Sequence, residues 1–175
     1  MVYFDIIFDI DDKAFDKISK LLGLSFYRLN KDIYLYNKAE PDNKSHIAFV
    51  DKPHQIKSLS KRGIRIFVIN NPDSPRKIVK YALEEDALLF IPISNILDDK
   101  IVNTIKIARK YEVLYNYALK ERVHVSIASF ASSIDKLLSR EQIISIARFI
   151  GYSEDYARYC LTEINREIIR KEIFI

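Results

Sequence analysis

Carboxylates near the start of the chain are the first residues whose types and spacing could do chemistry. Asp5, Asp9, Asp11 and Asp12 lie close together in sequence, and carboxylate oxygens are ligands that Mg²⁺ prefers in proteins. Asp11 and Asp12 also begin a predicted helix at 11–22, and acidic side chains stabilise the positive end of a helix. Helix capping is therefore favoured over a magnesium site.

The histidines and the single cysteine do not form a pattern typical of a metal site or an activated nucleophile. A metal-dependent hydrolase on an α/β barrel needs several His with carboxylates at strand ends, and no two of His46, His54 and His124 are at a spacing typical of metal ligands. Cys160 lies in a predicted helix without a nearby His, which favours a buried core residue. The chain has three Gly, and these are too few to form a phosphate-binding glycine motif and also to terminate the predicted helices. We therefore predict no nucleotide cofactor.

Four serines surround the end of a predicted strand at 123–127. They are Ser126, Ser129, Ser132 and Ser133. A turn with small side chains and exposed backbone N–H groups can hold a phosphate. A tight turn that only needs small side chains explains the same residues, and the sequence leaves both interpretations open.

Basic residues concentrate in the middle of the chain. Residues 51–80 hold eight Lys or Arg and two Asp, whereas residues 81–100 hold five acidic residues and one Lys. A basic region of this kind can hold a polyanion such as RNA. Aromatic residues beside basic ones, as at 26–28 and 109–111, suit single-stranded RNA, a core or a protein interface. Ordinary solvated helix faces also explain the charges, and the charge distribution alone slightly favours that explanation.

The elements that must position these residues alternate between strand and helix patterns. Strands are expected at 2–8, 27–36, 47–50, 64–69, 87–91 and 123–127, with helices between most of them and two capped by Ser139 and Ser153 near the end. This alternation is typical of an α/β fold with parallel strands covered by helices, either an open doubly wound sheet or a small irregular barrel.

One helix carries two further expectations. After the carboxylates at 98–99, the residues Ile101, Val102, Ile105 and Ala108 are predicted to face the core. Residues 113–119 fit either a strand or a continuation of that helix. The sequence alone does not separate these two alternatives.

Composition is typical of one domain covering residues 1–175. Hydrophobic residues make up 49% of the chain, enough for a core. No apolar run reaches the roughly 18–20 residues of a membrane span, and no basic leader precedes the first apolar run, so we expect neither a membrane span nor a signal peptide. The single cysteine fits a reducing, cytoplasmic location.

The last third of the chain carries a resemblance to a known family. A strand is followed by Ala-Ser-Phe-Ala at 128–131, Leu-Leu-Ser-Arg-Glu-Gln-Ile-Ile at 137–144 and Gly-Tyr-Ser-Glu-Asp-Tyr-Ala at 151–157. This order resembles the protein component 3 family of archaeal ribonuclease P, which is related to a nuclear subunit of the eukaryotic enzyme. The family has Ser-Ser-Gly-Ala, then Leu-Arg-Ser-Pro-Arg-Asp, then Gly-Met-Ser. Its glycine, arginine and proline correspond here to Phe130, Leu138 and Arg140.

The resemblance implies a fold, an activity and partners. The fold would be a small, irregular TIM-like α/β barrel related to metal-dependent phosphoesterases but without their metal site. The activity would be that of ribonuclease P, an RNA-based endoribonuclease that removes the 5′ leader of precursor tRNA. The catalytic RNA with Mg²⁺ would do the chemistry. This chain, with no catalytic residue, metal or cofactor of its own, would bind and stabilise that RNA together with protein component 2 and the other protein subunits.

We therefore predict a set of RNA contacts and keep two alternatives. The predicted contacts are Arg76, Lys77, Lys80, Arg109, Lys110, Ser129, Ser132 and Arg140. One alternative is a stand-alone phosphoesterase that uses Asp9, Asp51 and a metal. The other is a non-catalytic protein-interaction module of the same fold.

Overall fold

The structure is a computed structural model that describes residues 2–8, 10, 15, 18, 21, 22, 24–29, 47–97 and 100–168. Several expectations lie outside the described residues: most of the helix at 11–22, the strand at 27–36 from residue 30 onward, the capping carboxylates at 98–99, and the side chains of Asp9, Asp11, Asp12 and His46.

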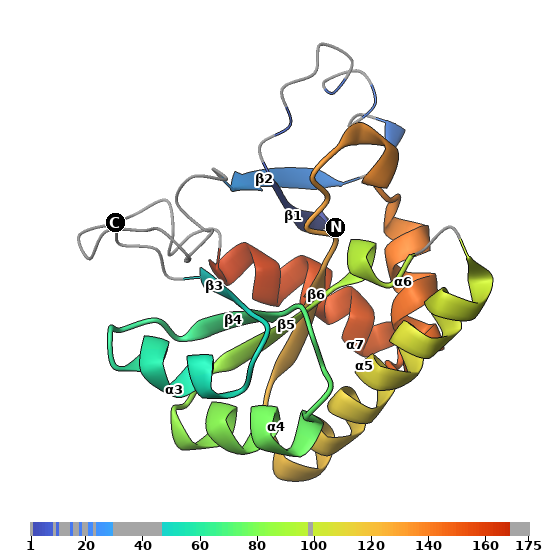
Figure 1. The fold of residues 1–175 in the computed structure, drawn as a ribbon. Coiled ribbons are helices and arrows are strands. Elements are labelled where there is room, and N and C mark those ends of the chain that lie inside the picture. Colours follow the sequence, from blue (N-terminus) through green and yellow to red (C-terminus); the bar gives the residue numbers. More distant parts are fainter. Residues whose placement is uncertain are drawn as a thin grey trace.

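Strands and helices alternate along the described chain, as expected (Figure 1). The strands are β1 (Phe4–Phe8), β2 (Ser25–Leu29), β3 (Ile47–Val50), β4 (Ile66–Ile69), β5 (Leu88–Pro92) and β6 (Val125–Ala128). The α-helices are α3 (His54–Ser60), α4 (Pro75–Glu84), α5 (Ile101–Glu121), α6 (Arg140–Phe149) and α7 (Glu154–Tyr159). Short 3₁₀ turns are η1 (Ile93–Asn95) and η2 (Ile134–Lys136), and η3 (Cys160–Ile164) is a π-helical turn.

All pairs among the described strands are parallel. β3, β4, β5 and β6 form one sheet in that order, and β1 pairs with β2 in a second, two-stranded sheet. In the larger sheet, each link between neighbouring strands contains a helix, which is the connection that parallel strands require. These observations confirm the α/β class with parallel strands and surrounding helices. In both sheets, neighbouring strands follow one another in the sequence, and this order occurs in closed barrels and in open sheets.

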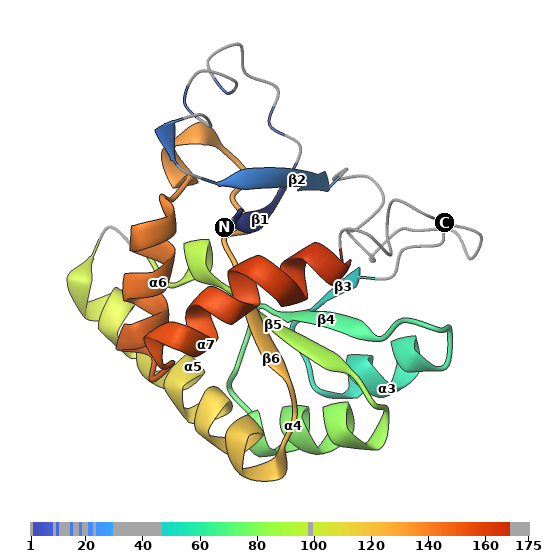
Figure 2. The same cartoon turned by 180° about the vertical axis from the view of Figure 1, so that it is seen from behind.

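Side chains alternate between two buried faces of the larger sheet. Ala48, Phe67, Leu89 and Ile127 belong to the face that packs against α3, α4, α5 and α6. On the other face, Ile47, Val68, Phe90 and Ala128 pack with β1 and with the end of the C-terminal helix. We call α7, η3 and residues 165–168 the C-terminal helix, and Figure 2 shows it crossing this second face. Burial on both faces explains the near-continuous apolar strands.

β1 and β6 lie side by side without a ladder of backbone hydrogen bonds, and polar groups join them. The Phe130 N–H donates to the Ile6 carbonyl at 2.8 Å. The Asn165 side chain lies between the two strands, and its Nδ2 donates to the Phe4 carbonyl at 3.1 Å and to the Ile127 carbonyl at 3.0 Å. The C-terminal helix therefore supplies bonds that a continuous sheet would make through its backbone.

The prediction for the inner face of α5 is wrong for its first turns. Ile101, Val102 and Ile105 are 74%, 57% and 45% exposed, and only Ala108 of the predicted set is buried. Residues 113–119 are helical, and the buried residues of α5 lie in its later turns: Ala108, Tyr111, Leu114, Tyr115 and Ala118. Helical periodicity identifies a face of a helix, but it does not tell which turns of that face are covered by neighbours.

The capping expectations for the last helices are confirmed. The Ser139 hydroxyl accepts from the Gln142 N–H at 3.3 Å while the Gln142 side chain accepts from the Ser139 N–H at 2.7 Å, which is a capping box. The Ser153 hydroxyl accepts from the Tyr156 N–H at 3.2 Å. Gly151, between the two helices, has a φ of +99°, which favours glycine.

Candidate nucleic-acid interface

Five of the predicted RNA contacts lie on two helices that pack against each other. α4 carries Arg76, Lys77 and Lys80, α5 carries Arg109 and Lys110, and all five side chains are exposed. The buried residues of α4 are Ile78, Val79 and Ala82, and its three cations lie at exposed positions of the same helix. We call this surface the α4–α5 face.

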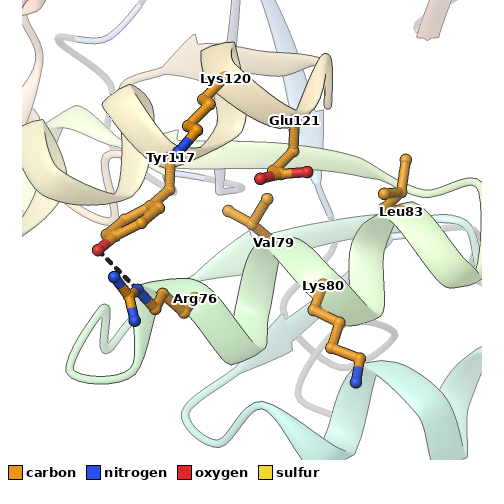
Figure 3. A pocket seen from close by; sticks show the side chains of 7 residues that line it. All are labelled: Arg76, Val79, Lys80, Leu83, Tyr117, Lys120 and Glu121. Atoms are coloured by element: carbon orange, nitrogen blue, oxygen red, sulfur yellow. Dashed lines mark hydrogen bonds between the residues drawn. The ribbon is translucent and has the colours of Figure 1, made fainter.

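A groove of about 350 Å³ lies between α4 and α5 (Figure 3). It is lined by Arg76, Val79, Lys80, Leu83, Tyr117, Lys120 and Glu121, which include three cations and one carboxylate. The Arg76 Nε donates to the Tyr117 hydroxyl at 2.7 Å, and the guanidinium carbon lies 5.2 Å from the ring centroid. The groove therefore combines positive charge with an aromatic ring.

A second, smaller groove of about 280 Å³ lies beside the start of α4. It is lined by Pro72, Asp73, Pro75, Arg109, Lys110 and Val113. The Lys110 Nζ lies 2.5 Å from the Asp73 Oδ1. This ammonium group, followed by the Asn71 side chain, lowers the pKa of the Asp73 carboxyl.

The cations of the α4–α5 face have exposed partners. Lys80 lies 3.7 Å from Glu84, and Arg109 lies 3.4 Å from Glu112. Exposed ion pairs of this kind contribute little to stability and are screened by salt. These side chains can therefore exchange a carboxylate partner for a phosphate at small cost.

Two residues of the larger groove, Tyr117 and Lys120, were not predicted from the sequence. Both lie at the end of α5, within or just beyond the stretch at 113–119 that fitted either a strand or a helix. Reading that stretch as helix would have placed Tyr117 and Lys120 three residues apart on one helix surface. Both residue types suit a nucleic-acid interface. They were not predicted because the sequence did not show whether this stretch is a helix or a strand.

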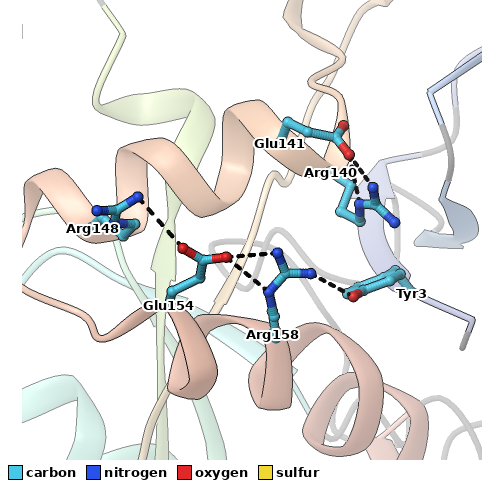
Figure 4. Close-up of polar contacts among 6 residues, drawn as sticks. All are labelled: Tyr3, Arg140, Glu141, Arg148, Glu154 and Arg158. Carbon is cyan, nitrogen blue, oxygen red and sulfur yellow. Dashed lines mark hydrogen bonds and ion pairs between the residues drawn. The ribbon is translucent and has the colours of Figure 1, made fainter.

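Arg140 does not belong to the α4–α5 face. It lies at the start of α6, where its guanidinium contacts Glu141 and its Cζ lies 4.7 Å from the Tyr3 ring centroid (Figure 4). The Tyr3 hydroxyl also accepts from Arg158 at 2.9 Å, and Arg158 pairs with Glu154 at 2.6 Å. The structure therefore places Arg140 in a separate polar network at the surface of α6 and α7.

The serine turn is a buried connection in the described structure. Ser129 is fully buried, its hydroxyl donates to the Asp5 Oδ2 at 2.5 Å, and its N–H donates to the Asp5 Oδ1 at 2.7 Å. Ser126 is also buried and donates to Asn165 at 3.0 Å. The structure thus argues against Ser129 as an RNA contact and explains why a small hydroxyl residue occupies the position. Ser132 is half-buried in the following loop.

Phe130 has an unusual backbone conformation. Its φ is +49°, a left-handed conformation that bulky residues rarely adopt. Its buried ring makes edge-to-face contacts with Phe49 and Phe90, with centroids 5.4 and 5.6 Å away. The ring packing offsets the backbone cost. An aromatic side chain therefore fills the space next to the carboxyl end of β6.

The remaining residues considered for catalysis or metal binding are Cys160, Asp51 and Asp9. Cys160 is buried, and burial raises the pKa of its thiol to about 12. Asp51 is exposed, and Asp9 lies outside the described residues. Over the described part of the chain, no three His, Cys, Asp or Glu side chains come together as a possible metal site. Among the described helices, none has the length and apolar character to cross a membrane.

No protein-family model and no curated protein matches this chain.

Proposed function

We propose that this chain is an RNA-binding protein subunit of ribonuclease P, with a TIM-like barrel fold, and that it binds RNA through the α4–α5 face. The observation that carries the proposal is the convergence of five predicted phosphate contacts on two packed helices. Sequence spacing alone did not require them to share a surface. Together with Lys120 they form a set of exposed cations on two neighbouring helices, which can neutralise several phosphates of an RNA backbone.

The conformation of Phe130 supports the resemblance to protein component 3. The family has a glycine at this position, and the φ of +49° is one that glycine adopts without strain. The Phe130 ring packs on the sheet face that β1 and the C-terminal helix cover, beside the carboxyl end of β6, and strand ends of this kind are where barrel enzymes carry catalytic groups. This packing favours a scaffold role over the phosphoesterase alternative.

An apolar surface at the start of α5 supports a protein partner. Leu97 lies just before α5, and Ile101, Val102 and Ile105 lie in its first turns. All four side chains are exposed. Large apolar side chains grouped on a surface are typical of protein–protein contacts. We assign this surface to the contact with protein component 2 of ribonuclease P.

The proposal is tested by precursor-tRNA cleavage at low Mg²⁺ with the catalytic RNA and the partner proteins, with and without this chain. A clear gain in 5′ maturation supports the subunit function. No gain, with the other components proven active, contradicts it and favours the protein-interaction alternative. Turnover of a phosphomonoester by the purified chain with added metal would instead favour the phosphoesterase alternative.

Replacing Arg76, Lys77 and Lys80 together with glutamine should weaken RNA binding and reduce its salt dependence. Every phosphate that is no longer neutralised lowers the slope of log K against log salt by about 0.7 to 0.9, so the slope should fall by about 2. Equilibrium binding over a salt series measures this. The matched control replaces Lys52, Lys61 and Lys136 with glutamine, which removes the same charge from exposed positions elsewhere. Equal slopes for the two triple variants would contradict the assigned face.

Replacing Ile101 and Ile105 with glutamate should abolish binding of protein component 2 without lowering the thermal stability of the chain, because both side chains are exposed. Titration calorimetry and a thermal melt measure the two quantities. Leu119→Gln, at another exposed apolar residue of α5, serves as the control. Undiminished binding by the double variant would remove this surface from the proposal.

A further inference from the structure

The groove between α4 and α5 has features that phosphate binding alone does not explain. A set of cations on a helix surface is sufficient to hold an RNA backbone. This surface also contains a recess with the Tyr117 ring on one wall and the apolar side chains of Val79 and Leu83 on the other (Figure 3). We infer that this groove holds one unstacked base of a single-stranded RNA segment. The inference rests on the proposed function and adds the kind of RNA and the way it is bound.

The size and lining of the groove suit a base. Its volume of about 350 Å³ is at the lower end of the range for small-molecule sites, roughly 300–1,000 Å³. Tyr117 is half-buried, so its ring is held in place while part of it faces the groove. Bases stack on such rings in single-strand binding proteins, and any base offers a face for stacking.

The charged side chains around the groove are complementary to the phosphates on either side of a base and to the amino group of cytosine. Arg76 on α4 and Lys120 on α5 place cations on both walls, where the phosphates before and after an inserted base would lie, whereas the Lys80 ammonium group is directed away from α5 (Figure 3). Glu121 is the only carboxylate in the lining, and Figure 3 shows it directed toward the space above Val79. A carboxylate there would repel a phosphate, but it can accept a hydrogen bond from the amino group of cytosine.

A duplex cannot use the groove in this way. The bases of an A-form helix are stacked and paired, and proteins recognise the helix through phosphates and 2′-hydroxyls. Duplex RNA would therefore contact the cations of the α4–α5 face but not the Tyr117 ring. An acidic peptide is the other occupant that this charge pattern could accept, and it is distinguished by the test below.

The test compares wild type, Tyr117→Leu and Tyr117→Phe in equilibrium binding of the full chain. The probes are an oligocytidine, an RNA duplex with the same number of phosphates, and a poly-glutamate peptide. Tyr117→Leu should weaken oligocytidine binding by at least about fivefold, the effect of losing one stacked base, and change duplex binding by less than about twofold. Tyr117→Phe keeps the ring and should retain oligocytidine affinity. Leu83→Gln gives a second readout at an exposed side chain, with the same selective loss expected.

The outcomes separate the inference from the proposed function. If wild type binds both RNAs and the Tyr117→Leu and Leu83→Gln variants weaken neither or both equally, the groove holds no base and only the inference fails. If wild type binds neither RNA, the proposed function fails as well. Binding of poly-glutamate in preference to oligocytidine would assign the groove to an acidic protein and overturn the inference.

Discussion

Replacing Asn165 with leucine should destabilise the protein by about 3 kcal/mol or more. The Asn165 side chain is fully buried, and its two N–H groups donate to backbone carbonyls of β1 and β6 while its oxygen accepts from the Ser126 hydroxyl. Leucine has a similar volume but leaves two carbonyls and one hydroxyl without this partner. Each buried polar group that loses its partner costs about 1–3 kcal/mol.

Urea unfolding of the wild type and the variant measures this difference. Asn116→Leu is the matched control, because Asn116 is exposed on α5 and the same change there should shift the free energy of unfolding by less than about 0.5 kcal/mol. Ser126→Ala removes only one of the three bonds and should give an intermediate loss. Equal losses for Asn165→Leu and Asn116→Leu would mean that the three Asn165 hydrogen bonds do not contribute to stability.

The role of Asn165 matters for the arrangement of the whole fold. β1 and β6 are joined by few backbone hydrogen bonds, and the C-terminal helix lies against both of them. The π-helical turn η3 directly precedes Asn165, and such turns often occur where a helix serves a special purpose. Without the Asn165 hydrogen bonds, β1 and the C-terminal helix should therefore loosen first, while α4 and α5 on the opposite face keep their packing.

The local elements were predictable because their signals are local. Ser139 and Gln142 form the expected capping box, and the apolar strands at 47–50 and 123–127 lie within one or two residues of β3 and β6. The residues of the α4–α5 face were predictable as cations. Their convergence was not, because it depends on the packing of α4 against α5.

The buried polar residues could not be predicted because their partners are distant in sequence. Asp5 bonds Ser129, and Asn165 bonds Phe4 and Ile127. From the sequence alone, Asp5 is one of several acidic residues near the start of the chain, and Ser129 is predicted to belong to a turn. Only the approach of β1 to β6 makes the two residues a pair.

The stability of the protein should fall as the pH rises from 3.8 to about 6 because of Asp5. The Asp5 carboxyl is fully buried, and this burial raises its pKa from 3.8 to about 6, although hydrogen bonds from Ser129 and the Ile6 N–H act in the opposite direction. The folded protein therefore holds the Asp5 proton to a higher pH than the unfolded chain does. Where the folded state binds more protons, stability decreases as pH rises.

The expected size of the effect follows from the two pKa values. A rise from 3.8 to about 6 corresponds to about 3 kcal/mol, at 1.36 kcal/mol per pKa unit. The contribution of neutral Asp5 is fully present below pH 3.8, is lost mainly between pH 3.8 and about 6, and is absent above that range. Other titrating groups contribute to the same curve, so the Asp5 effect must be measured as a difference between variants.

Asp5→Asn provides that difference. An asparagine is neutral at every pH, its oxygen can accept from the Ile6 and Ser129 N–H groups, and its NH₂ can donate to the Ser129 hydroxyl oxygen. The free energy of unfolding of Asp5→Asn minus that of the wild type should rise by about 3 kcal/mol from pH 3.8 to pH 7, measured by urea unfolding. Asp135→Asn makes the same charge change at an exposed position and controls for net charge.

A flat difference across this range would show that Asp5 remains ionised in the folded protein. In that case the three hydrogen bonds would outweigh the cost of burial, since each N–H or O–H donor favours the charged carboxylate. Ser129→Ala distinguishes the two causes, because it removes the hydroxyl donor and leaves the buried position unchanged. If burial dominates, as we expect, Ser129→Ala should extend the loss of stability to higher pH. If the hydrogen bonds dominate, Ser129→Ala should create a pH dependence that the wild type lacks.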